Sequence, residues 1–337
     1  MTVHAARLRA QGLSGPPAAT ADDVVERLLA VQAQDARGLR LAVRARSTGL
    51  HASDVDAALA DRRLVVDWLN RGTLHLARAE DHAWLHRLTT PQLATGNARR
   101  LRQEGVSPQQ AERGVDVVRR AVQDGPQTRD ALRELVAAAG VPVAGQALVH
   151  VLVLASLRGH VLRGPFVGAQ QAFVDARDWL GRRPDVDADD ALARLAHRYL
   201  VGHGPADAAD LARWAGVRLT DARRGLALLA DRVVERDGLL DVAGREDPPP
   251  LPPPRLLGPF DPLLLGWTSR ADVVGPHLSL VTDNGLFRPC ALVQGRAVAT
   301  WRWVEGHVVL TPLEPVDDAA LRALEDDARD VERFLAG

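Results

Sequence analysis

The feature that most constrains the fold is a recurring order of elements, in which helices are followed by a pair of short strands. The first set comprises helical patterns over Val3–Gln11, Ala21–Val31 and Asp54–Arg62, then β-rich runs over Leu64–Leu69 and Gly72–Leu76. A Thr20 cap favours the start of the second helix, and Asn70-Arg71-Gly72 supplies the turn between the strands. Three helices and a hairpin are the order of a winged helix, a member of the helix-turn-helix class.

The same order recurs twice further along the chain. The second set comprises Thr128–Ala139, Gly145–Leu157 and a short wing at Arg158–Pro165, and the third comprises Leu192–Tyr199, Ala206–Ala215, Thr220–Leu229 and a wing at Arg232–Leu240. The expected C-terminal elements are strands at Leu278–Thr282, Cys290–Val293, Ala297–Val304 and His307–Leu310, then a helix at Asp317–Phe334. We therefore predict a mainly α protein with β-hairpin wings, of the α+β class, with three tandem winged-helix motifs plus a β-rich C-terminal portion.

A chain of 337 residues is long enough for two or three domains, each with its own core. The predicted division is winged helix 1 with a Gln-Ala-Gln motif at 1–90, connecting helices at 91–124, winged helix 2 at 125–187, winged helix 3 at 188–246, a Pro-rich connector at 247–256, and a β-rich segment with a closing acidic helix at 257–337. The chain start has no apolar signal core, and no apolar run is long enough to span a bilayer. We expect a cytoplasmic monomer.

Positive charge is concentrated in the N-terminal half. Residues 1–165 carry 22 Arg against 16 acids, a balance of +6, whereas residues 166–337 carry 20 Arg against 27 acids, a balance of −7. The net charge of −1 conceals this asymmetry. The asymmetry predicts that a polyanion would bind to the N-terminal half. All the basic residues other than histidine are arginine, so a lysine Schiff base is excluded. The single cysteine, Cys290, excludes an intrachain disulfide.

Two glutamines, Gln32 and Gln34, follow the apolar helical run that ends at Val31. Residues two apart point the same way in extended chain but not on a helix, so we expect the helix to end near Val31 and both amides to project together. An amide has no titratable proton, yet it accepts and donates hydrogen bonds at once and can hold a water in one orientation. That suffices for hydrolysis when the leaving group is already activated, as a cationic N-alkylated DNA base is. On spacing alone, such a pair is more often two surface residues at a helix end.

Two groups of arginines are candidate phosphate contacts. Arg99, Arg100 and Arg102 are expected on a helix, where the alternative is an ordinary solvated face. The segment after the glutamines is expected to be extended and to line a groove for the substrate backbone, or else to form an exposed strand edge. Its arginines are Arg37, Arg40, Arg44 and Arg46. The predicted DNA-binding residues are Arg37, Arg40, Arg99, Arg100 and Arg102.

The histidines do not predict a cofactor. His82 and His86 lie four apart on a helix, which is metal-ligand spacing, but the run between them lacks the glutamate of a metalloprotease helix. His75 alternates with leucines in a hairpin strand, where a lone histidine is more often structural. We predict neither a metal nor an organic cofactor.

Several stretches resemble those of the AlkZ-like winged-helix DNA glycosylases. They are Val31–Gln34, which matches the family's catalytic Gln-apolar-Gln motif, Arg71–Leu76, Tyr199–Ala206 with Trp214 downstream, the run with Asp261-Pro262, Trp267 and Arg270, and Arg288–Trp301. No single stretch is specific, whereas their order and spacing cover nearly the whole chain. The resemblance implies that Gln32 and Gln34 are catalytic. It also implies excision of bulky N7-alkylguanine or N3-alkyladenine from double-stranded DNA, in some members with unhooking of interstrand crosslinks and protection of antibiotic producers from their own genotoxin.

A second interpretation is a non-catalytic winged-helix DNA-binding protein or transcriptional regulator. Winged helices are used for binding far more widely than for catalysis, and a fold does not fix a function. Burial of both glutamine amides against the protein's own backbone would favour this alternative.

Overall fold

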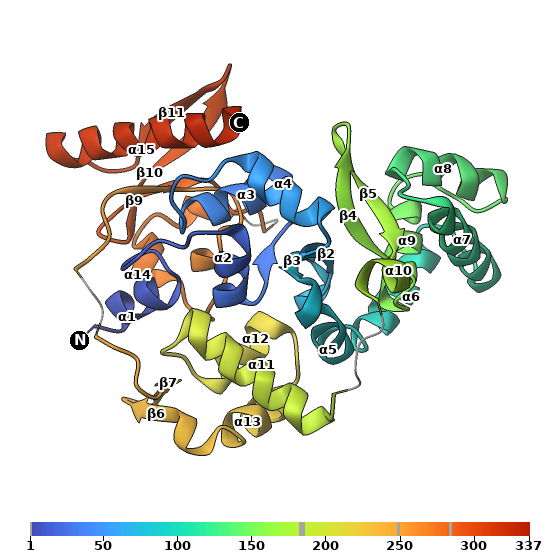
Figure 1. Ribbon diagram of the computed structural model, residues 1–337, viewed down its shortest axis with the longest axis horizontal. Helices are drawn as coiled ribbons and strands as arrows, with labels where there is room; N and C mark the ends of the chain where they lie inside the picture. The colour runs from blue at the N-terminus through green and yellow to red at the C-terminus, as the bar shows by residue number, and fades with distance from the viewer. Residues whose placement is uncertain (1, 182–185, 248–249, 283–284) are drawn as a thin grey trace. The chain divides into compact units, whose positions relative to one another are not determined.

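The protein consists of two compact units, one of which interrupts the other in sequence (Figure 1). The computed structural model describes residues 2–181, 186–247, 250–282 and 285–337. The first unit comprises Met1–Val55 together with Ala188–Gly337, and the second comprises Asp56–Asp187. Both contain helices and antiparallel strand pairs, which confirms a mixed fold of helices and strands. Within the described parts of the chain, no helix has the length and apolar character needed to cross a membrane.

The N-terminal part of the first unit is a set of short helices joined by tight turns. Its elements are α1 (Val3–Ala10), α2 (Ala21–Leu28), β1 (Val31–Gln32) and α3 (Ala36–Arg44), after which α4 (Ala52–Ala60) leads into the second unit. Helix α2 begins with a capping box, in which Thr20 and Asp23 each accept the other's backbone N–H. Helix α3 begins at Asp35, whose carboxylate accepts the Gly38 N–H at 2.6 Å. The Asp35 cap fixes the C-terminal end of the segment that contains the glutamines, and the Thr20 cap fixes the start of the helix before it.

After the interruption, the first unit continues with three helices and a hairpin. They are α11 (Ala188–His203), α12 (Ala208–Ala215), α13 (Leu219–Ala227), β6 (Val233–Arg236) and β7 (Leu239–Val242). Helix α12 starts with a capping box at Asp207 and ends at Gly216, which adopts the left-handed conformation. The order of elements is the one predicted for this region.

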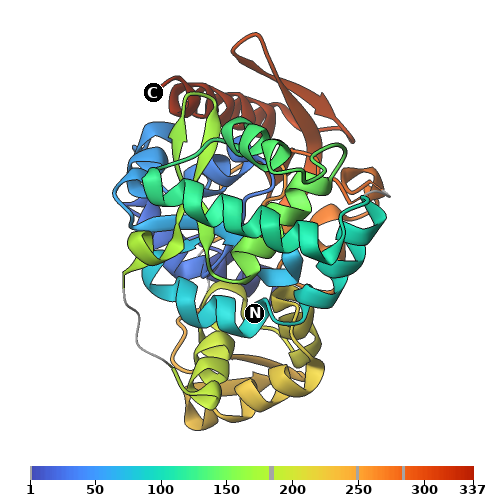
Figure 2. The same cartoon turned by 90° about the vertical axis from the view of Figure 1, so that its right-hand side faces the viewer.

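A four-stranded antiparallel sheet and a long helix complete the first unit. The sheet order is β11 (His307–Pro312), β10 (Arg296–Val304), β9 (Cys290–Val293) and β8 (Arg255–Leu257), and the closing helix is α15 (Asp318–Ala336). Helix α15 runs along the sheet and buries Leu324 and Phe334 (Figures 1 and 2). The strand predicted at Leu278–Thr282 is wrong, because Leu278–Leu280 forms a 3-10 turn. Leu278 is 74% exposed whereas Leu280 is buried, so the apolar run has no single face to bury.

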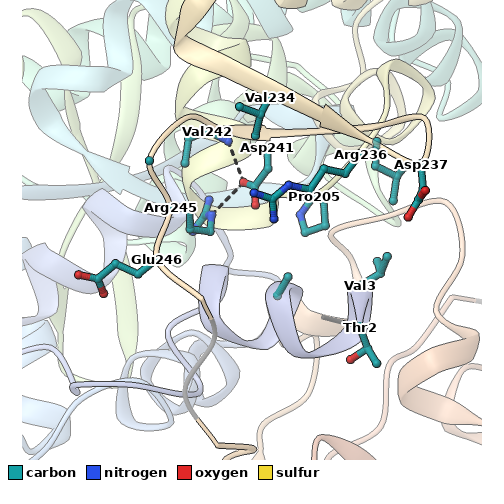
Figure 3. Close-up of a pocket in the computed structure, with 13 residues that line it drawn as sticks. Thr2, Val3, Pro205, Val234, Arg236, Asp237, Asp241, Val242, Arg245 and Glu246 are labelled. Atoms are coloured by element: carbon teal, nitrogen blue, oxygen red, sulfur yellow. Dashed lines mark hydrogen bonds and ion pairs between the residues drawn. The ribbon is translucent and has the colours of Figure 1, made fainter.

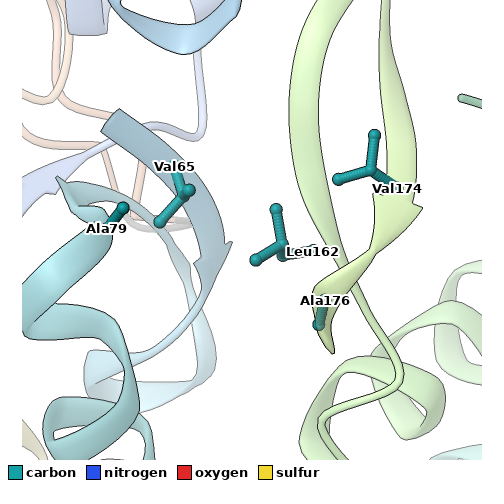
Figure 4. Close-up of a cluster of buried hydrophobic side chains, with 5 residues drawn as sticks. All are labelled: Val65, Ala79, Leu162, Val174 and Ala176. Carbon is teal, nitrogen blue, oxygen red and sulfur yellow. The ribbon is translucent and has the colours of Figure 1, made fainter. Parts of the chain in front are cut away.

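The second unit is built on strands in the order β3, β2, β4, β5. They are β2 (Leu64–Trp68), β3 (Leu74–Arg78), β4 (Val161–Val167) and β5 (Gln170–Asp175), with helices α5 (Ala79–Thr89), α6 (Leu93–Gln103), α7 (Pro108–Ala121), α8 (Arg129–Ala138), α9 (Ala147–Leu157) and α10 (Ala176–Leu180). One buried cluster joins Val65, Leu162 and Val174 (Figure 4). The wing predicted to end at Pro165 is longer than expected, because a register shift after Arg163 carries β4 past that proline to pair with β5.

Candidate active site

The two glutamines follow a strained turn at the end of α2. The helix ends at Leu28, earlier than the predicted end near Val31. Leu29 adopts φ 64° and ψ −48°, and the Ala30 N–H donates to Leu28 O at 2.8 Å, which together form a γ-turn with positive φ. A non-glycine residue in such a conformation costs about 1–3 kcal/mol and persists only where its surroundings impose it. Strain of this kind clusters at functional sites.

The glutamines themselves differ in burial. Gln32 lies in β1, which is the extended conformation predicted for it, and it is 7% exposed. Gln34 lies in the bend that precedes α3, beyond the strand, and its side chain is exposed. Asp35, the next residue, is the cap of α3, so its carboxylate is occupied by the Gly38 N–H. A single amide is therefore buried, not both.

The segment after the glutamines is helical, and two of its arginines are buried rather than lining a groove. The extended strand predicted here is wrong, because the Asp35 cap starts α3 and the helix buries Leu39 and Leu41. Arg44 Nη2 donates to Asp327 Oδ2 at 2.8 Å and to the Leu256 carbonyl at 2.8 Å. These contacts fix the far end of α3 within the first unit.

Arg46 forms the most buried ion pair of the site. Its Nη1 and Nη2 donate to the two carboxylate oxygens of Asp261 at 2.9 and 2.8 Å, and both side chains are 1% exposed or less. Its Nε donates to the Gln11 carbonyl at 2.8 Å, and Gln11 Nε2 in turn donates to Gly202 O at 2.7 Å. The loop before Asp261 approaches α3 closely, since a Cβ on Gly38 would lie 2.5 Å from Pro259 O. The start of α3 therefore packs directly against the backbone of the loop before Asp261.

Three of the stretches that carry the family resemblance meet in this scaffold. Asp261 holds Arg46, and Gly202 contacts the end of α2, where an added Cβ would lie 2.6 Å from Arg27 O. Trp267 Nε1 donates to His203 O at 2.9 Å, which joins the stretch around Asp261 to the stretch Tyr199–Ala206. Residues of these two stretches thus pack against the end of α2 and pair with Arg46 beyond α3, on the two sides of the segment that contains the glutamines.

The predicted DNA-binding arginines lie in both units. In the first unit, Arg37 is exposed on α3 with its guanidinium 5.6 Å from the centre of the Trp303 ring on β10. Arg40 is half-buried and donates to Ala36 O at 2.9 Å within its own helix. In the second unit, three arginines are exposed on α6, as a phosphate contact requires. They are Arg99, Arg100 and Arg102.

The histidine pair of the second unit belongs to a buried hydrogen-bond network. Asp67 accepts the Ser156 Oγ–H at 2.5 Å and lies 2.7 Å from His82 Nε2. His86 stacks on His82 with ring centres 5.3 Å apart and bonds the Ser156 carbonyl at 2.9 Å. Across the residues that the structure describes, no three His, Cys, Asp or Glu side chains gather as a metal site would need.

His75 is a buried neutral histidine. It lies opposite Asp67 in the β2–β3 register, is 2% exposed, and its Nδ1–H donates to Thr73 O at 2.9 Å. Burial, with a smaller contribution from the Arg71 charge, lowers the pKa of His75 to about 3. The imidazole is therefore neutral throughout the working pH range, which supports its structural interpretation.

This pKa gives a testable pH dependence. Between about pH 6.5 and about pH 3 the unfolded chain binds a proton at His75 that the folded protein excludes, so the free energy of unfolding falls as the pH falls. The loss from this group approaches about 1.4 kcal/mol per pH unit within that window. His75→Asn keeps a donor for Thr73 O and removes the titration. Urea unfolding at several pH values should show a shallower acid loss for the variant, and identical slopes would contradict the assignment.

A separate cavity of about 330 Å³ lies in the first unit among α1, β6 and β7 (Figure 3). Its wall includes Asp241, whose Oδ1 accepts from Arg245 Nε and from the Val242 N–H at 2.8 Å each. None of the predicted site residues lines it. The chemistry predicted for the glutamines therefore belongs elsewhere, at the turn before α3.

Comparison with known proteins agrees with the stretches described above. Residues 25–334 match the family described as DNA glycosylase AlkZ-like. The chain is 28% identical to the interstrand DNA cross-link repair glycosylase of Streptomyces sahachiroi, over 98% of this chain and 95% of that protein. The solved structure of Streptomyces sahachiroi DNA glycosylase AlkZ is similar with a TM-score of 0.80 and 27% identity, again over 98% and 95% of the two chains. Because the match spans most of the sequence, the chain belongs to the AlkZ-like family of DNA glycosylases.

Proposed function

We propose that this protein is a monofunctional DNA glycosylase that hydrolyses the N-glycosidic bond of bulky N7-alkylguanine or related alkylated bases in double-stranded DNA. Gln32 and Gln34 hold the attacking water and stabilise the charge that develops on the sugar. The observation that carries the proposal is the setting of the glutamines, between a strained turn at Leu29 and the capped start of α3. Such rigid placement is what a positioned dipole needs in order to favour a transition state.

The chemistry of the site fits a cationic leaving group. Asp35 is the nearest carboxylate along the chain, and its engagement with Gly38 N leaves it to cap α3 rather than to act as a base. An N-alkylated purine leaves without protonation because its positive charge already weakens the glycosidic bond. The chain has no lysine, so strand cleavage through a lysine Schiff base is excluded, and only the N-terminal amine could substitute. Hydrolysis by an oriented water is the remaining route.

The relatives extend the proposal to crosslinks. Since a curated relative is named for interstrand cross-link repair, we include unhooking of crosslinked DNA and protection from a genotoxin among the proposed activities. We also propose that segment 188–246, with its three helices and hairpin, acts as one of three winged helices, and that the protein acts as a cytoplasmic monomer. Burial of both glutamine amides would have favoured the regulator alternative, whereas Gln34 is exposed.

The decisive experiment is a release assay over a panel of duplexes. The panel runs from 7-methylguanine through bulky natural-product adducts to interstrand crosslinks, with undamaged duplex as the control. We expect free modified base and an abasic site, with no strand cleavage until heat or alkali is applied. Sequence-specific binding to undamaged DNA without release from any damaged duplex would overturn the proposal in favour of the regulator.

The exposed arginines on α6 give a second prediction. If each of Arg99, Arg100 and Arg102 neutralises one phosphate, replacing all three with alanine should flatten the log–log dependence of DNA binding on salt by about 2–3. Affinity should fall alike for damaged and undamaged duplexes, because phosphates carry no lesion information. Binding titrations over a range of salt concentrations measure the slope. A slope equal to that of the wild type would identify the cluster as an ordinary solvated helix face.

A further inference from the structure

Two arginines of the second unit are not among the predicted DNA-binding residues, namely Arg163 in β4 and Arg129 at the start of α8. Arg163 of β4 is paired with Phe173 of β5 in the strand register. Its guanidinium lies 5.2 Å from the centre of the Phe173 ring and 5.4 Å from that of Trp68, and these two rings stack on each other. The guanidinium therefore makes cation–π contacts with both aromatic rings.

Arg129 is held close to Arg163 by backbone pairing. Gln127 and Phe173 exchange two backbone hydrogen bonds, of 2.9 and 2.7 Å, which place the start of α8 beside β5. Arg129 is the first residue of that helix. Burial and, to a smaller extent, the neighbouring charge of Arg129 lower the pKa of Arg163 to about 10, although the Asp67 carboxylate acts in the opposite direction. Arg163 therefore remains cationic at neutral pH, in a setting that penalises its charge.

Within the described chain, neither arginine has a carboxylate partner. The Nε atoms of Arg129 and Arg163 are both buried without a hydrogen-bond acceptor. The nearby acids form hydrogen bonds with other residues. Asp67 bonds Ser156 and His82, and Asp130 accepts from Gln170 Nε2 at 2.5 Å. This contrasts with the first unit, where the buried Arg44 and Arg46 each meet an aspartate.

Two partly buried like charges without an anion are costly unless a ligand supplies the anion. The guanidinium of Arg163 lies against two aromatic rings, and its planar fork of N–H groups suits the geometry of phosphate oxygens. The register shift that follows Arg163 is a feature that re-aims side chains beside functional sites. The missing partner is therefore anionic, and its expected chemistry is that of a phosphate.

Building on the proposed glycosylase function, we infer that Arg129 and Arg163 together bind one backbone phosphate of the DNA substrate. They are positioning residues, which fix the register of the duplex on the second unit without contacting the reacting atoms. Because a phosphate contact contributes to DNA binding rather than to bond cleavage, their loss raises KM for alkylated duplex more than it lowers kcat.

The test compares Arg129→Gln, Arg163→Gln and the double variant with Arg120→Gln, a control that removes one exposed arginine from α7. Binding of an undamaged duplex is titrated over a range of salt concentrations. The double variant should flatten the log–log slope by about 1, the value for one phosphate, while Arg120→Gln leaves it unchanged. Arg163→Lys should keep most of the slope, because a lysine still places a positive charge there.

An unchanged slope in the double variant, with its melting temperature preserved, overturns the inference. If inorganic phosphate raises the melting temperature of the wild type but not of the double variant, and the duplex slope is unchanged, the site binds a free anion and the DNA contact is refuted. Base release by the wild type is measured in parallel. Release together with an unchanged slope refutes only this pair, whereas a changed slope without release from any alkylated duplex refutes the glycosylase proposal and leaves a phosphate contact of a DNA-binding protein.

Discussion

Replacing Gln32 or Gln34 with alanine is expected to slow the release of alkylated base by roughly 10²-fold or more, the scale of losing one positioned dipole. The two variants should differ in stability. Gln34 is exposed, so Gln34→Ala should change the free energy of unfolding by no more than about 0.5 kcal/mol. Gln32 is 7% exposed, and its truncation also removes a buried amide. Loss of activity in a fully stable Gln34→Ala protein would therefore isolate the chemical role.

The measurement is single-turnover release of 7-alkylguanine from alkylated duplex, which separates bond cleavage from product release. Gln109→Ala, a substitution of an exposed glutamine on α7, is the matched control and should retain wild-type activity. Duplex affinity should change little in the Gln34 variant, since the water that it orients is needed only for the reaction. Wild-type rates in both glutamine variants would remove the pair from the catalytic site.

The second large effect is on stability. Asp261→Ala is expected to lower the free energy of unfolding of the first unit by about 3–5 kcal/mol, because it leaves the Arg46 charge buried without a partner. The matched control is Asp221→Ala, which breaks the Arg218–Asp221 pair, where the arginine side chain is 82% exposed. An exposed pair of that kind contributes little to stability, because water and salt screen its charges. Urea unfolding followed by tryptophan fluorescence and circular dichroism compares the two.

A double substitution separates charge from packing in the same site. Arg46→Met with Asp261→Leu removes both charges, so it should be less destabilising than Asp261→Ala alone. Equal losses in the single and double variants would mean that shape, not the uncompensated charge, sets the cost. A loss below about 1 kcal/mol for Asp261→Ala would contradict the role given to the pair in holding α3.

The sequence predicted those elements of the fold whose start or turn is determined by neighbouring residues. The capping box at Thr20 and the turn between β2 and β3 lie within a few residues of the elements they define, and both elements were predicted. The burial of Arg44 and Arg46 in ion pairs was not predicted, because their partners Asp327 and Asp261 lie 283 and 215 residues further along the chain. Local sequence alone does not distinguish arginines that are buried in ion pairs with distant acids from arginines that are exposed to solvent.

The same reasoning applies to the candidate site. The spacing of the glutamines predicted that both lie in extended chain, which is right for Gln32 in β1 but not for Gln34, which lies in the bend before α3. The γ-turn at Leu29 was not predictable, because leucine has no preference for positive φ and only the surrounding packing imposes it. The phosphate site inferred at Arg129 and Arg163 was missed for a similar reason, since strand register alone brings these two residues together.

The interruption of the first unit by the second sets an order for assembly on the ribosome. The glutamines and α3 emerge early, yet Asp261 and Asp327 are synthesised only after the whole of Asp56–Asp187. At about 5–20 residues per second, translating that insertion takes on the order of 10 s. The contiguous second unit can fold once it has emerged, whereas Arg44 and Arg46 remain without their aspartates until the rest of the first unit is made. The scaffold behind Gln32 and Gln34 is thus completed last, and a chain released before α15 is made would carry both glutamines without the Arg44–Asp327 pair.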